Sequence, residues 1–434
     1  MSMIWAYERL ASCLFGVSRP FLSVLSRLEG AGGMWHGRLG YTAEGFASAG
    51  PHDLWIQAVS VGEVAVAEAI IAAIEKKAPA LKVLVSSSTP AGYARALSSI
   101  GRRCPVIPYP LDFPQVVRRI TAAVRPSVYA CLEAELWPNL IRSVRRMGAR
   151  TVLMNARISA RAFHRYRMFR PVFRPLIAGF SRICAISELH AERLAELGAD
   201  RERIVVTGNA KYEGLLSRPS EARREALKNR LGIGEGTPVL VAGSLRKGEE
   251  RYLVQVSVHL KDRHPDLVIF LVPRHPKRVP SFVKALDSAG LGYQNWSSIE
   301  MEGVRKSDLV LVDVIGPLFD LYGLATAAFV GGSLVPKGGH NLMEPAAWGC
   351  PVISGPHTEN FEEARRSLEG SGGGIFVEDL EEMESCLDGI LRSRERRQSM
   401  GQAARLALEG LSQGSATRQA EILLHVLGEA GLEA

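Results

Sequence analysis

Short apolar runs alternate with amphipathic stretches twice along this 434-residue chain. In the first series the apolar runs, interpreted as buried strands, are 54–59, 82–85, 105–107, 127–132, 151–154, 183–186 and 204–206. The stretches between them with helical spacing of apolar residues are 63–77, 90–100, 113–124, 138–147 and 188–197. Strand–helix alternation with short links is typical of a parallel sheet covered by helices on both faces. The sequence therefore predicts an α/β, doubly wound fold.

The alternation stops at residue 208 and resumes near residue 238. The interval is polar, charged and punctuated by glycines, which predicts a linker with a short helix. Strands of the second series are expected at 239–242, 268–272, 309–312, 328–330, 352–353 and 375–377. From Glu395 to Leu432 the periodicity is helical and no strand is predicted.

These patterns divide the chain into five regions: an N-terminal segment (1–35), a first Rossmann-like domain (36–207), a linker (208–237), a second Rossmann-like domain (238–394) and C-terminal helices (395–434). Two α/β halves joined by a linker predict an interdomain cleft, where the carboxyl ends of both sheets face one pair of ligands.

The N-terminal segment has apolar residues at helical spacing from Ile4 to Leu28, with a kink expected at Pro20. Such a helix either lies in a membrane interface or docks on the protein's own core, and its pattern leaves both interpretations open. No apolar run reaches 18 residues, so no transmembrane helix is expected. Glu8, Arg9 and Arg19 interrupt the segment, which argues against a signal peptide.

The six cysteines never come closer than 27 positions, so no zinc-ligand spacing exists and no metal site is predicted. Positive charge, in contrast, is concentrated. The net charge is +8, yet residues 136–187 contain no acid and eleven arginines. A local basic segment of this kind predicts an anionic partner that contacts one part of the protein.

Several common catalytic motifs are absent from the sequence: the P-loop, HExxH and the GxSxG nucleophile elbow. The glycine runs at 232–236 and 370–374 precede strands instead of following them, so they are interpreted as loops. Hydride transfer and P-loop phosphoryl transfer are therefore not supported.

Acidic residues follow two predicted strands in the first domain. Glu63 lies in the first turn of a helix, where the helix dipole favours an ionised carboxylate that could act as a general base, although first-turn acids commonly only stabilise the helix. Glu133 and Glu135 close another strand and are either used in chemistry or paired with arginines. Arg157, after Asn155, closes the next strand at the same predicted edge.

The second domain has a glycine-rich loop, Gly331-Gly332-Ser333, directly after a strand, followed by His340 and Asn341 before a helix. Glycines that let the backbone approach, together with free N–H groups at a helix start, suit a phosphate. Glu344, one turn into that helix, could bind ribose hydroxyls, and Lys211 and Arg274 add cations. We interpret His340 as a ligand-binding residue of this loop.

Taken in order, a set of motifs resembles the 3-deoxy-D-manno-octulosonic acid (Kdo) transferase family. They are Ser60-Val61-Gly62-Glu63, Glu133-x-Glu135-Leu-Trp-Pro-Asn139, Asn155-Ala-Arg157-Ile-Ser159, Gly208-Asn-x-Lys211, Gly243-Ser244-x-x-x-Gly248-Glu249-Glu250, Pro273-Arg274-His275-Pro276, Gly331-Gly332-Ser333 and Gly339-His340-Asn341-x-x-Glu344-Pro-Ala. The likeness runs from about residue 40 to about residue 363.

The resemblance implies a GT-B fold and inverting, metal-independent transfer of Kdo from CMP-Kdo to a lipid A precursor, lipid IVA, in lipopolysaccharide biosynthesis. Besides the donor CMP-Kdo it implies no cofactor. Glu63 would be the general base, and Glu133 and Arg157 would lie on the acceptor side. The nucleotide-sugar site would comprise Lys211, Ser244, Arg274, Gly332, Ser333, His340, Asn341 and Glu344.

The chain also departs from the family pattern. Gln57 and Arg246 stand where histidine is usual, Ala134 and Leu245 where threonine is usual, and Glu213 where aspartate is common. Glu63, Lys211 and Glu344 are unaffected, so the departures concern surrounding contacts, including those near the donor phosphate.

Two other functions compete with this interpretation. One is another GT-B glycosyltransferase or a sugar-nucleotide epimerase that uses a UDP-sugar. The other, nucleic-acid binding through the arginines, is disfavoured because few aromatics flank them and no RNA motif is present. We expect the arginines and the N-terminal helix to face an anionic membrane surface and the lipid acceptor, at the cytoplasmic face of the inner membrane, held peripherally or by the N-terminus.

Overall fold

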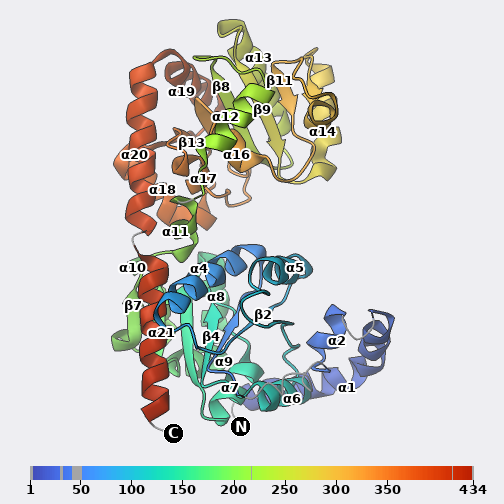
Figure 1. The fold of residues 1–434 in the computed structure, drawn as a ribbon, viewed down its shortest axis with the longest axis vertical. Coiled ribbons are helices and arrows are strands. Elements are labelled where there is room, and N and C mark those ends of the chain that lie inside the picture. Colours follow the sequence, from blue (N-terminus) through green and yellow to red (C-terminus); the bar gives the residue numbers. More distant parts are fainter. Residues whose placement is uncertain (1–2, 30–32, 42–50, 217, 413, 433–434) are drawn as a thin grey trace. The chain divides into compact units, whose positions relative to one another are not determined.

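The alternating apolar runs form two parallel sheets in the computed structural model, which describes residues 3–29, 33–41, 51–216, 218–412 and 414–432 (Figure 1). The chain divides into two compact units. Unit 1 comprises residues 1–214 and 412–434, and unit 2 comprises residues 215–411. Each unit contains one of the sheets, so the predicted α/β, doubly wound fold is confirmed.

The sheet of unit 1 has seven described strands that all pair in parallel. They are β1 (Leu54–Gln57), β2 (Val83–Ser87), β3 (Val106–Pro108), β4 (Val128–Leu132), β5 (Arg150–Ala156), β6 (Arg182–Ala185) and β7 (Ile204–Val206). Their order is β3-β2-β1-β4-β5-β6-β7, so the direction of winding reverses between β1 and β4. In open α/β sheets such a switch point leaves a crevice at the carboxyl ends of the strands.

The helices of unit 1 cover both faces of this sheet (Figure 1). They are α1 (Met3–Glu29), α2 (Met34–Arg38), α4 (Val61–Lys77), α5 (Pro90–Ser99), α6 (Pro114–Val124), α7 (Pro138–Arg146), α8 (Ala160–Met168), α9 (Arg170–Ala178), α10 (Glu188–Glu196), the first part of α11 (Ala210–Leu216) and α21 (Ser415–Leu432).

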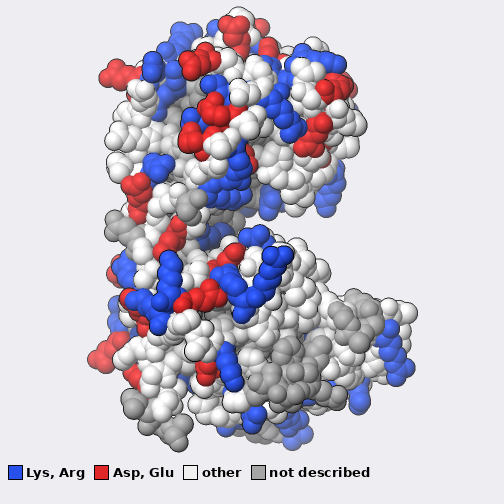
Figure 2. All heavy atoms as spheres, in the orientation of Figure 1, with Lys and Arg blue, Asp and Glu red and all other residues white. Residues whose placement is uncertain are grey.

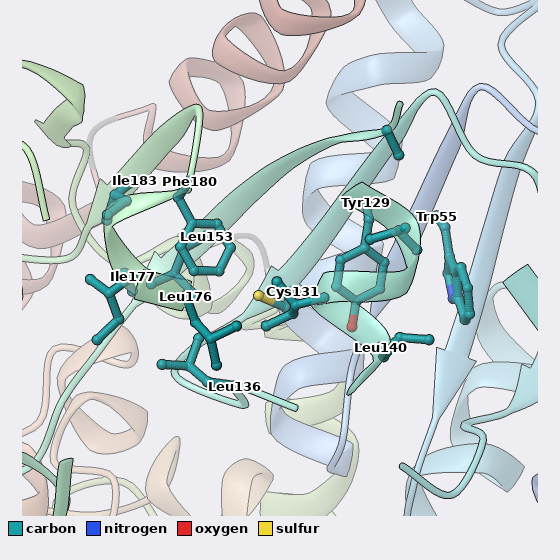
Figure 3. Close-up of a cluster of buried hydrophobic side chains, with 14 of the residues drawn as sticks. Trp55, Tyr129, Cys131, Leu136, Leu140, Leu153, Leu176, Ile177, Phe180 and Ile183 are labelled. Atoms are coloured by element: carbon teal, nitrogen blue, oxygen red, sulfur yellow. The ribbon is translucent and has the colours of Figure 1, made fainter. Parts of the chain in front are cut away.

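Side chains of successive strand residues point to opposite faces of the sheet, as the two-residue period of a strand requires. Trp55, Tyr129 and Cys131 pack under α6, α7, α9 and α10 (Figure 3), whereas Leu54 and Ile56 pack under α4, α5 and α21. Both faces are buried, which explains why these strands are continuous apolar runs in the sequence.

The sheet of unit 2 also has seven described strands in parallel pairing, in the order β10-β11-β9-β8-β12-β13-β14. They are β8 (Val239–Leu245), β9 (Val268–Pro273), β10 (Gln294–Asn295), β11 (Leu309–Leu311), β12 (Ala327–Val330), β13 (Val352–Ser354) and β14 (Gly374–Phe376). Winding reverses between β8 and β12. The two-residue edge strand β10 was not predicted, because so short a polar segment has no apolar pattern.

Helices again cover both faces of the second sheet. They are α12 (Glu221–Arg230), α13 (Glu250–Arg263), α14 (Val279–Ser288), α15 (Trp296–Glu302), α16 (Leu318–Tyr322), α17 (Met343–Ala347), α18 (Glu362–Ser371), α19 (Leu380–Arg392) and α20 (Arg394–Ser412). The chain then returns to unit 1, where α21 buries Ala416, Ala420, Leu423 and Val426 against the first sheet. The sequence predicted helical structure for these residues but did not predict that the helix packs on the first sheet.

One face of the N-terminal helix α1 docks on the core of unit 1, as one of the two interpretations of its sequence expected. Ile4, Ala11 and Leu22 are buried against unit 1, and the Tyr7 hydroxyl donates a hydrogen bond to Asp112 Oδ2 at 3.0 Å. A second face of the helix is apolar and exposed. Its side chains are Leu10, Leu14, Val17, Phe21, Val24 and Leu28. Among the described residues, no helix is both long and apolar enough to span a bilayer.

Candidate active site

The sequence-predicted site residues gather at the carboxyl ends of strands beside the two switch points. In unit 1, Glu63 follows β1 and Glu133 follows β4. In unit 2, Ser244 lies at the end of β8, and Gly332 and Ser333 follow β12. Each sheet therefore has its motifs where its winding reverses, which is the place where open α/β sheets bind ligands.

Strained backbone marks the same strand ends. Glu133, Asn155 and Ser244 have φ values of 55°, 48° and 58°, a left-handed region that non-glycine residues seldom adopt. The ladders shift register beside Asn155 and Ser244, as at β-bulges. Bulges and left-handed residues that persist against their conformational cost cluster at functional sites.

The carboxylate of Glu63 is buried at the start of α4 and has few hydrogen-bond donors. Its Oε2 accepts from the backbone N–H of Val59 at 2.9 Å, and its Oε1 accepts from the Ser60 hydroxyl at 3.1 Å. Ser60 in turn caps the helix by accepting from the Glu63 N–H at 3.4 Å. This arrangement differs from a capping box in one respect, because the acid accepts from the N–H of the residue before the cap and from the hydroxyl of the cap itself.

Burial, and then the neighbouring carboxylates of Glu133 and Glu135, raise the pKa of Glu63 to about 8. The hydrogen bonds from Val59 and Ser60 act in the opposite direction but do not prevail. The sequence-based expectation that the helix dipole keeps this carboxylate ionised was therefore wrong for neutral pH in the free protein. The physical reason is that desolvation of a buried charge outweighs a dipole effect of about 1 kcal/mol.

Helix α8 packs on the loop that bears the other two acids. The Tyr166 hydroxyl donates to the backbone oxygen of Ala134, between Glu133 and Glu135, at 2.6 Å. Burial, and then Glu133, raise the pKa of Glu135, while the Arg165 charge lowers it. The sequence did not reveal this contact, because no helix was predicted at the position of α8.

Lys211 lies beside Gly62 in unit 1. Its Nζ atom is 3.3 Å from the position that a Cβ on Gly62 would take, so a larger residue there would press on the ammonium. The sequence predicted Lys211 as a nucleotide ligand together with residues that the structure places in unit 2. That role remains a prediction.

A polar network that the sequence did not predict holds the loop before Lys211. Asn155 accepts from the Ala210 N–H at 2.9 Å and donates to Asn209 at 3.2 Å, and Asn209 accepts from the Lys211 N–H at 3.1 Å. Gln419 of α21 accepts from the Asn155 N–H at 3.0 Å. The C-terminal helix thus braces the segment that carries Lys211.

Arg157 is partly buried in the loop that follows β5, next to His190. Burial lowers the pKa of His190 to about 4, with further contributions from Arg157 and Arg193, and its ring bonds the backbone of Ile158. A neutral His190 therefore shapes this loop. An acceptor-side role for Arg157 stays a prediction.

In unit 2 a fully buried carboxylate, Glu249, organises the loop after β12. It accepts from the N–H groups of Gly332 at 2.7 Å and of Ser333 and Leu334 at 3.0 Å each. The backbone N–H of Arg246 completes the set at 2.7 Å. Glu249 was visible in the sequence only as part of the Gly248-Glu249-Glu250 motif, without a role.

These contacts occupy the backbone amides of the glycine-rich loop. The N–H groups of Gly332 and Ser333 are engaged by Glu249, and the Ser333 hydroxyl, fully buried, donates to the Val330 oxygen at 2.7 Å. The loop amides are therefore not free donors at the sheet edge, because a carboxylate already fills the nest they form. Gly332 (φ 71°) supplies the turn that brings His340 against this loop.

Arg246, His340, His275 and Arg274 form a basic cluster above that loop. Arg246 Nε donates to His340 Nε2 at 2.9 Å, and Arg246 Nη1 lies 3.5 Å from His275 Nε2. Burial, and then the charges of Arg246 and Arg274, lower the pKa of His340 to about 3. His340 is therefore neutral and acts as a hydrogen-bond acceptor through Nε2. The sequence predicted His340 and Arg274 but not Arg246.

Asn341 and Glu344 start the short helix α17. The Asn341 side-chain oxygen accepts from the Met343 N–H at 3.2 Å, and its amide lies 3.5 Å from Glu344 Oε1. Both residues are partly exposed. Their predicted role as nucleotide ligands fits this exposure and remains a prediction.

Eight of the eleven arginines of residues 136–187 fall into two groups. Arg142 pairs with Glu8 at 2.9 Å, Arg150 with Glu429 at 2.6 Å, and Arg145 donates to Thr151 and to the Leu176 oxygen. These arginines brace unit 1. The other group is exposed on α8 and α9 and consists of Arg161, Arg165, Arg167, Arg170 and Arg174.

Among the described residues, no group of three or more histidine, cysteine, aspartate or glutamate side chains could hold a metal ion. The prediction of metal-independent chemistry thus rests on the resemblance.

Comparison with known proteins adds independent information. Residues 33–214 match a family described as 3-deoxy-D-manno-octulosonic-acid transferase (kdotransferase). The chain is similar to the 3-deoxy-D-manno-octulosonic acid transferase of Haemophilus influenzae, with 33% identity over 81% of this chain and 82% of the relative. It is also 32% identical to the enzyme of the same name from Bordetella pertussis, over 87% of this chain and 90% of the relative.

Solved structures that resemble this chain support the fold. A glycosyltransferase from Rickettsia africae is similar with a TM-score of 0.60 and 15% identity, over 87% of this chain and 99% of that chain. A putative UDP-N-acetylglucosamine 2-epimerase from Listeria monocytogenes has a TM-score of 0.63 and 14% identity, over 89% and 98%. The Rossmann-like GT-B fold class is thereby confirmed.

Proposed function

Because this chain belongs to the 3-deoxy-D-manno-octulosonic acid (Kdo) transferase family, we propose that it moves Kdo from CMP-Kdo to a lipid A precursor, lipid IVA, in lipopolysaccharide biosynthesis. The enzyme class, a glycosyltransferase of the Kdo transferase type, follows from the family. The observation that carries the mechanism is the buried carboxylate of Glu63 at the switch point of unit 1, with its raised pKa.

In this mechanism Glu63 acts as the general base. Its carboxylate takes the proton of the acceptor hydroxyl while the hydroxyl oxygen forms a bond to the anomeric carbon of Kdo. The bond from that carbon to the phosphate oxygen breaks on the opposite face, its electron pair leaves with CMP, and the configuration inverts. A pKa near the working pH suits a base that must both accept and release a proton.

Unit 2 supplies the donor site in this proposal. Arg246 and Arg274 provide positive charge for the anionic donor, and the partly exposed Asn341 and Glu344 would bind its ribose hydroxyls. A sugar nucleotide has a built-in leaving group, so fixed cations and correct placement account for most of the catalysis required of the protein. No metal is needed in this scheme.

The direct test is incubation with CMP-Kdo and a tetraacylated lipid A precursor, with the products resolved by mass spectrometry. Glu63→Gln keeps the size of the side chain but removes the base, so we expect transfer to fall by about 10²–10⁴-fold while CMP binding stays close to wild type. Glu68→Gln, on the same helix but partly exposed in a pair with Arg95, is the matched control. Equal loss of transfer and CMP binding in Glu63→Gln would refute the assignment of the base.

A membrane surface is the second partner that we propose. The exposed apolar residues of α1 recur at intervals of four and three from Leu10 to Leu28, and the exposed arginines of α9 lie on an element packed against α1. Over α1 and α2, Figure 2 shows mainly uncharged and basic side chains. An apolar helix face with nearby cations is typical of binding to the interface of an anionic bilayer, at the cytoplasmic face of the inner membrane in this proposal.

Flotation with vesicles that contain anionic lipid tests this partner. We expect the triple change Leu14→Ser, Val17→Ser and Phe21→Ser to abolish flotation, because each apolar side chain contributes about 1.5–3 kcal/mol when buried. Arg170→Gln with Arg174→Gln should weaken it mainly at low salt. Leu406→Ser, on an exposed position of α20, serves as the control. Unchanged flotation of the triple variant would contradict the proposal.

A further inference from the structure

Arg246 occupies a central place in the basic cluster of unit 2. Its backbone N–H is fixed by Glu249 Oε2 at 2.7 Å, so its Cα position is set by the same carboxylate that shapes the loop after β12. Its guanidinium contacts two imidazoles, His340 at 2.9 Å and His275 at 3.5 Å. One side chain therefore connects the strand ends of β8, β9 and β12.

The hydrogen bond to His340 has a definite chemical consequence. A guanidinium can only donate, so His340 Nε2 must be the unprotonated nitrogen and the ring proton must lie on Nδ1. The neutral ring then presents one N–H donor, and the positive charge of the cluster comes from Arg246 and Arg274. Among the described residues, Arg246 is the hydrogen-bond partner that makes Nε2 the acceptor, while burial is the largest cause of the lowered pKa of the ring.

Positive charge in this cluster is offset only in part. Glu249 acts on Arg246 electrostatically, but its two oxygens accept four backbone N–H groups and not the guanidinium. Within the described ranges, the hydrogen bonds given for the Arg246 side chain go to His340 and His275, and none goes to a carboxylate. A cluster with fixed cations and a neutral N–H donor suits a ligand with more than one anionic oxygen group.

We propose that Arg246 is a positioning residue of the donor site, which fixes His340 as the neutral Nδ1–H tautomer and contributes one of two charges toward the donor's anions. The proposal rests on the proposed function for the identity of the donor. A nucleotide-activated 2-keto sugar acid has a phosphate and a carboxylate attached to the same carbon. Arg246 and Arg274 match two anionic groups, and His340 Nδ1–H adds a directional donor that discriminates their placement.

The tautomer is tested first, in the ligand-free full-length protein, by nitrogen NMR of the histidine rings. We expect wild-type His340 to be protonated on Nδ1 alone from pH 5 to pH 8. In Arg246→Gln we expect the ring to titrate nearer its ordinary range, because the nearby cation is gone. Lys247→Gln removes an equal charge from the exposed neighbouring residue and should leave the ring unchanged.

CMP binding by calorimetry provides the second readout. We expect Arg246→Gln to weaken CMP binding by about tenfold or more at pH 8 and to make it stronger as the pH falls and His340 becomes protonated, whereas the wild type shows no such trend. His340→Gln, whose side chain can also accept from Arg246 and donate, should stay within about threefold of the wild type, and His340→Leu should lose about tenfold.

If the cluster were only structural, Arg246→Gln would change neither the tautomer of His340 nor the pH dependence of CMP binding. That result would overturn the proposal, as would a loss of CMP affinity in Lys247→Gln equal to that in Arg246→Gln. If Arg246→Gln fails to fold, the CMP affinities of His340→Gln and His340→Leu test the proposal instead, and equal affinities would overturn it. A wild-type protein that binds UMP instead of CMP would refute the proposed function but would leave the assignment of the His340 tautomer intact.

Discussion

Two buried carboxylates lie near the two switch points, and they differ in how many donors they receive. Glu249 of unit 2 accepts four backbone N–H groups, whereas the hydrogen bonds described for Glu63 of unit 1 come from one N–H and one hydroxyl. Glu63 also faces two further acids. A carboxylate surrounded by N–H donors is a fixed part of the framework, whereas one with few donors and acidic neighbours holds its proton and is available for chemistry.

The largest effect expected from this contrast is on stability. Glu249→Ala would leave the N–H groups of Gly332, Ser333 and Leu334 buried without a partner, at about 1–3 kcal/mol each. We expect a loss of several kcal/mol in the free energy of unfolding, measured by denaturant titration. Glu250 is the partly exposed neighbour of Glu249 and accepts a hydrogen bond from the Gly248 N–H. We expect Glu250→Ala to lower the free energy of unfolding by about 1 kcal/mol. Equal losses would show that the four-donor set does not stabilise the loop.

Removal of the Glu63 charge should raise the free energy of unfolding at high pH, the opposite of what is expected for Glu249. Its pKa in the folded state, about 8, lies above its ordinary value, so the folded protein holds the proton over this range while the unfolded chain has lost it. The contribution of Glu63 to stability therefore falls as the pH rises from about 4.5 to 8. We expect Glu63→Gln to be more stable than wild type by about 1–3 kcal/mol at pH 9 and equal to it at pH 4, by thermal unfolding. No gain at pH 9 would contradict the buried, donor-poor description.

The smallest effect concerns the acidic neighbour. Removal of the Glu133 charge lowers the pKa of Glu63, because this charge is the largest contribution after burial. We expect kcat/KM to rise with pH through a limb near pH 8 in the wild type, and Glu133→Gln to shift this limb to lower pH. Glu196→Gln, an exposed acid on α10, is the control. An unshifted limb in Glu133→Gln would show that the Glu133 charge does not affect the pKa of Glu63.

Much of the fold follows from local patterns. The apolar runs of β1, β4, β8 and β12 are continuous because both faces of each sheet are covered, and this made the strands and the doubly wound topology predictable. Helices α8 and α9 were missed, because their arginines obscure the apolar period that Tyr166, Val172 and Leu176 provide.

The sequence by itself determined the two Rossmann-like sheets, the place of Glu133 and Ser244 at strand ends, of Glu63 in a first helical turn and of His340 in the loop before a helix. Strand and turn signals suffice for this because they act over a few neighbouring residues. Only the tertiary structure decided which groups meet across long separations. Arg246 reaches His340, Glu249 takes the amides of the loop after β12, and Gln419 reaches Asn155. These pairs decide protonation and burial, and burial is a property of the packed sheet that no local pattern contains.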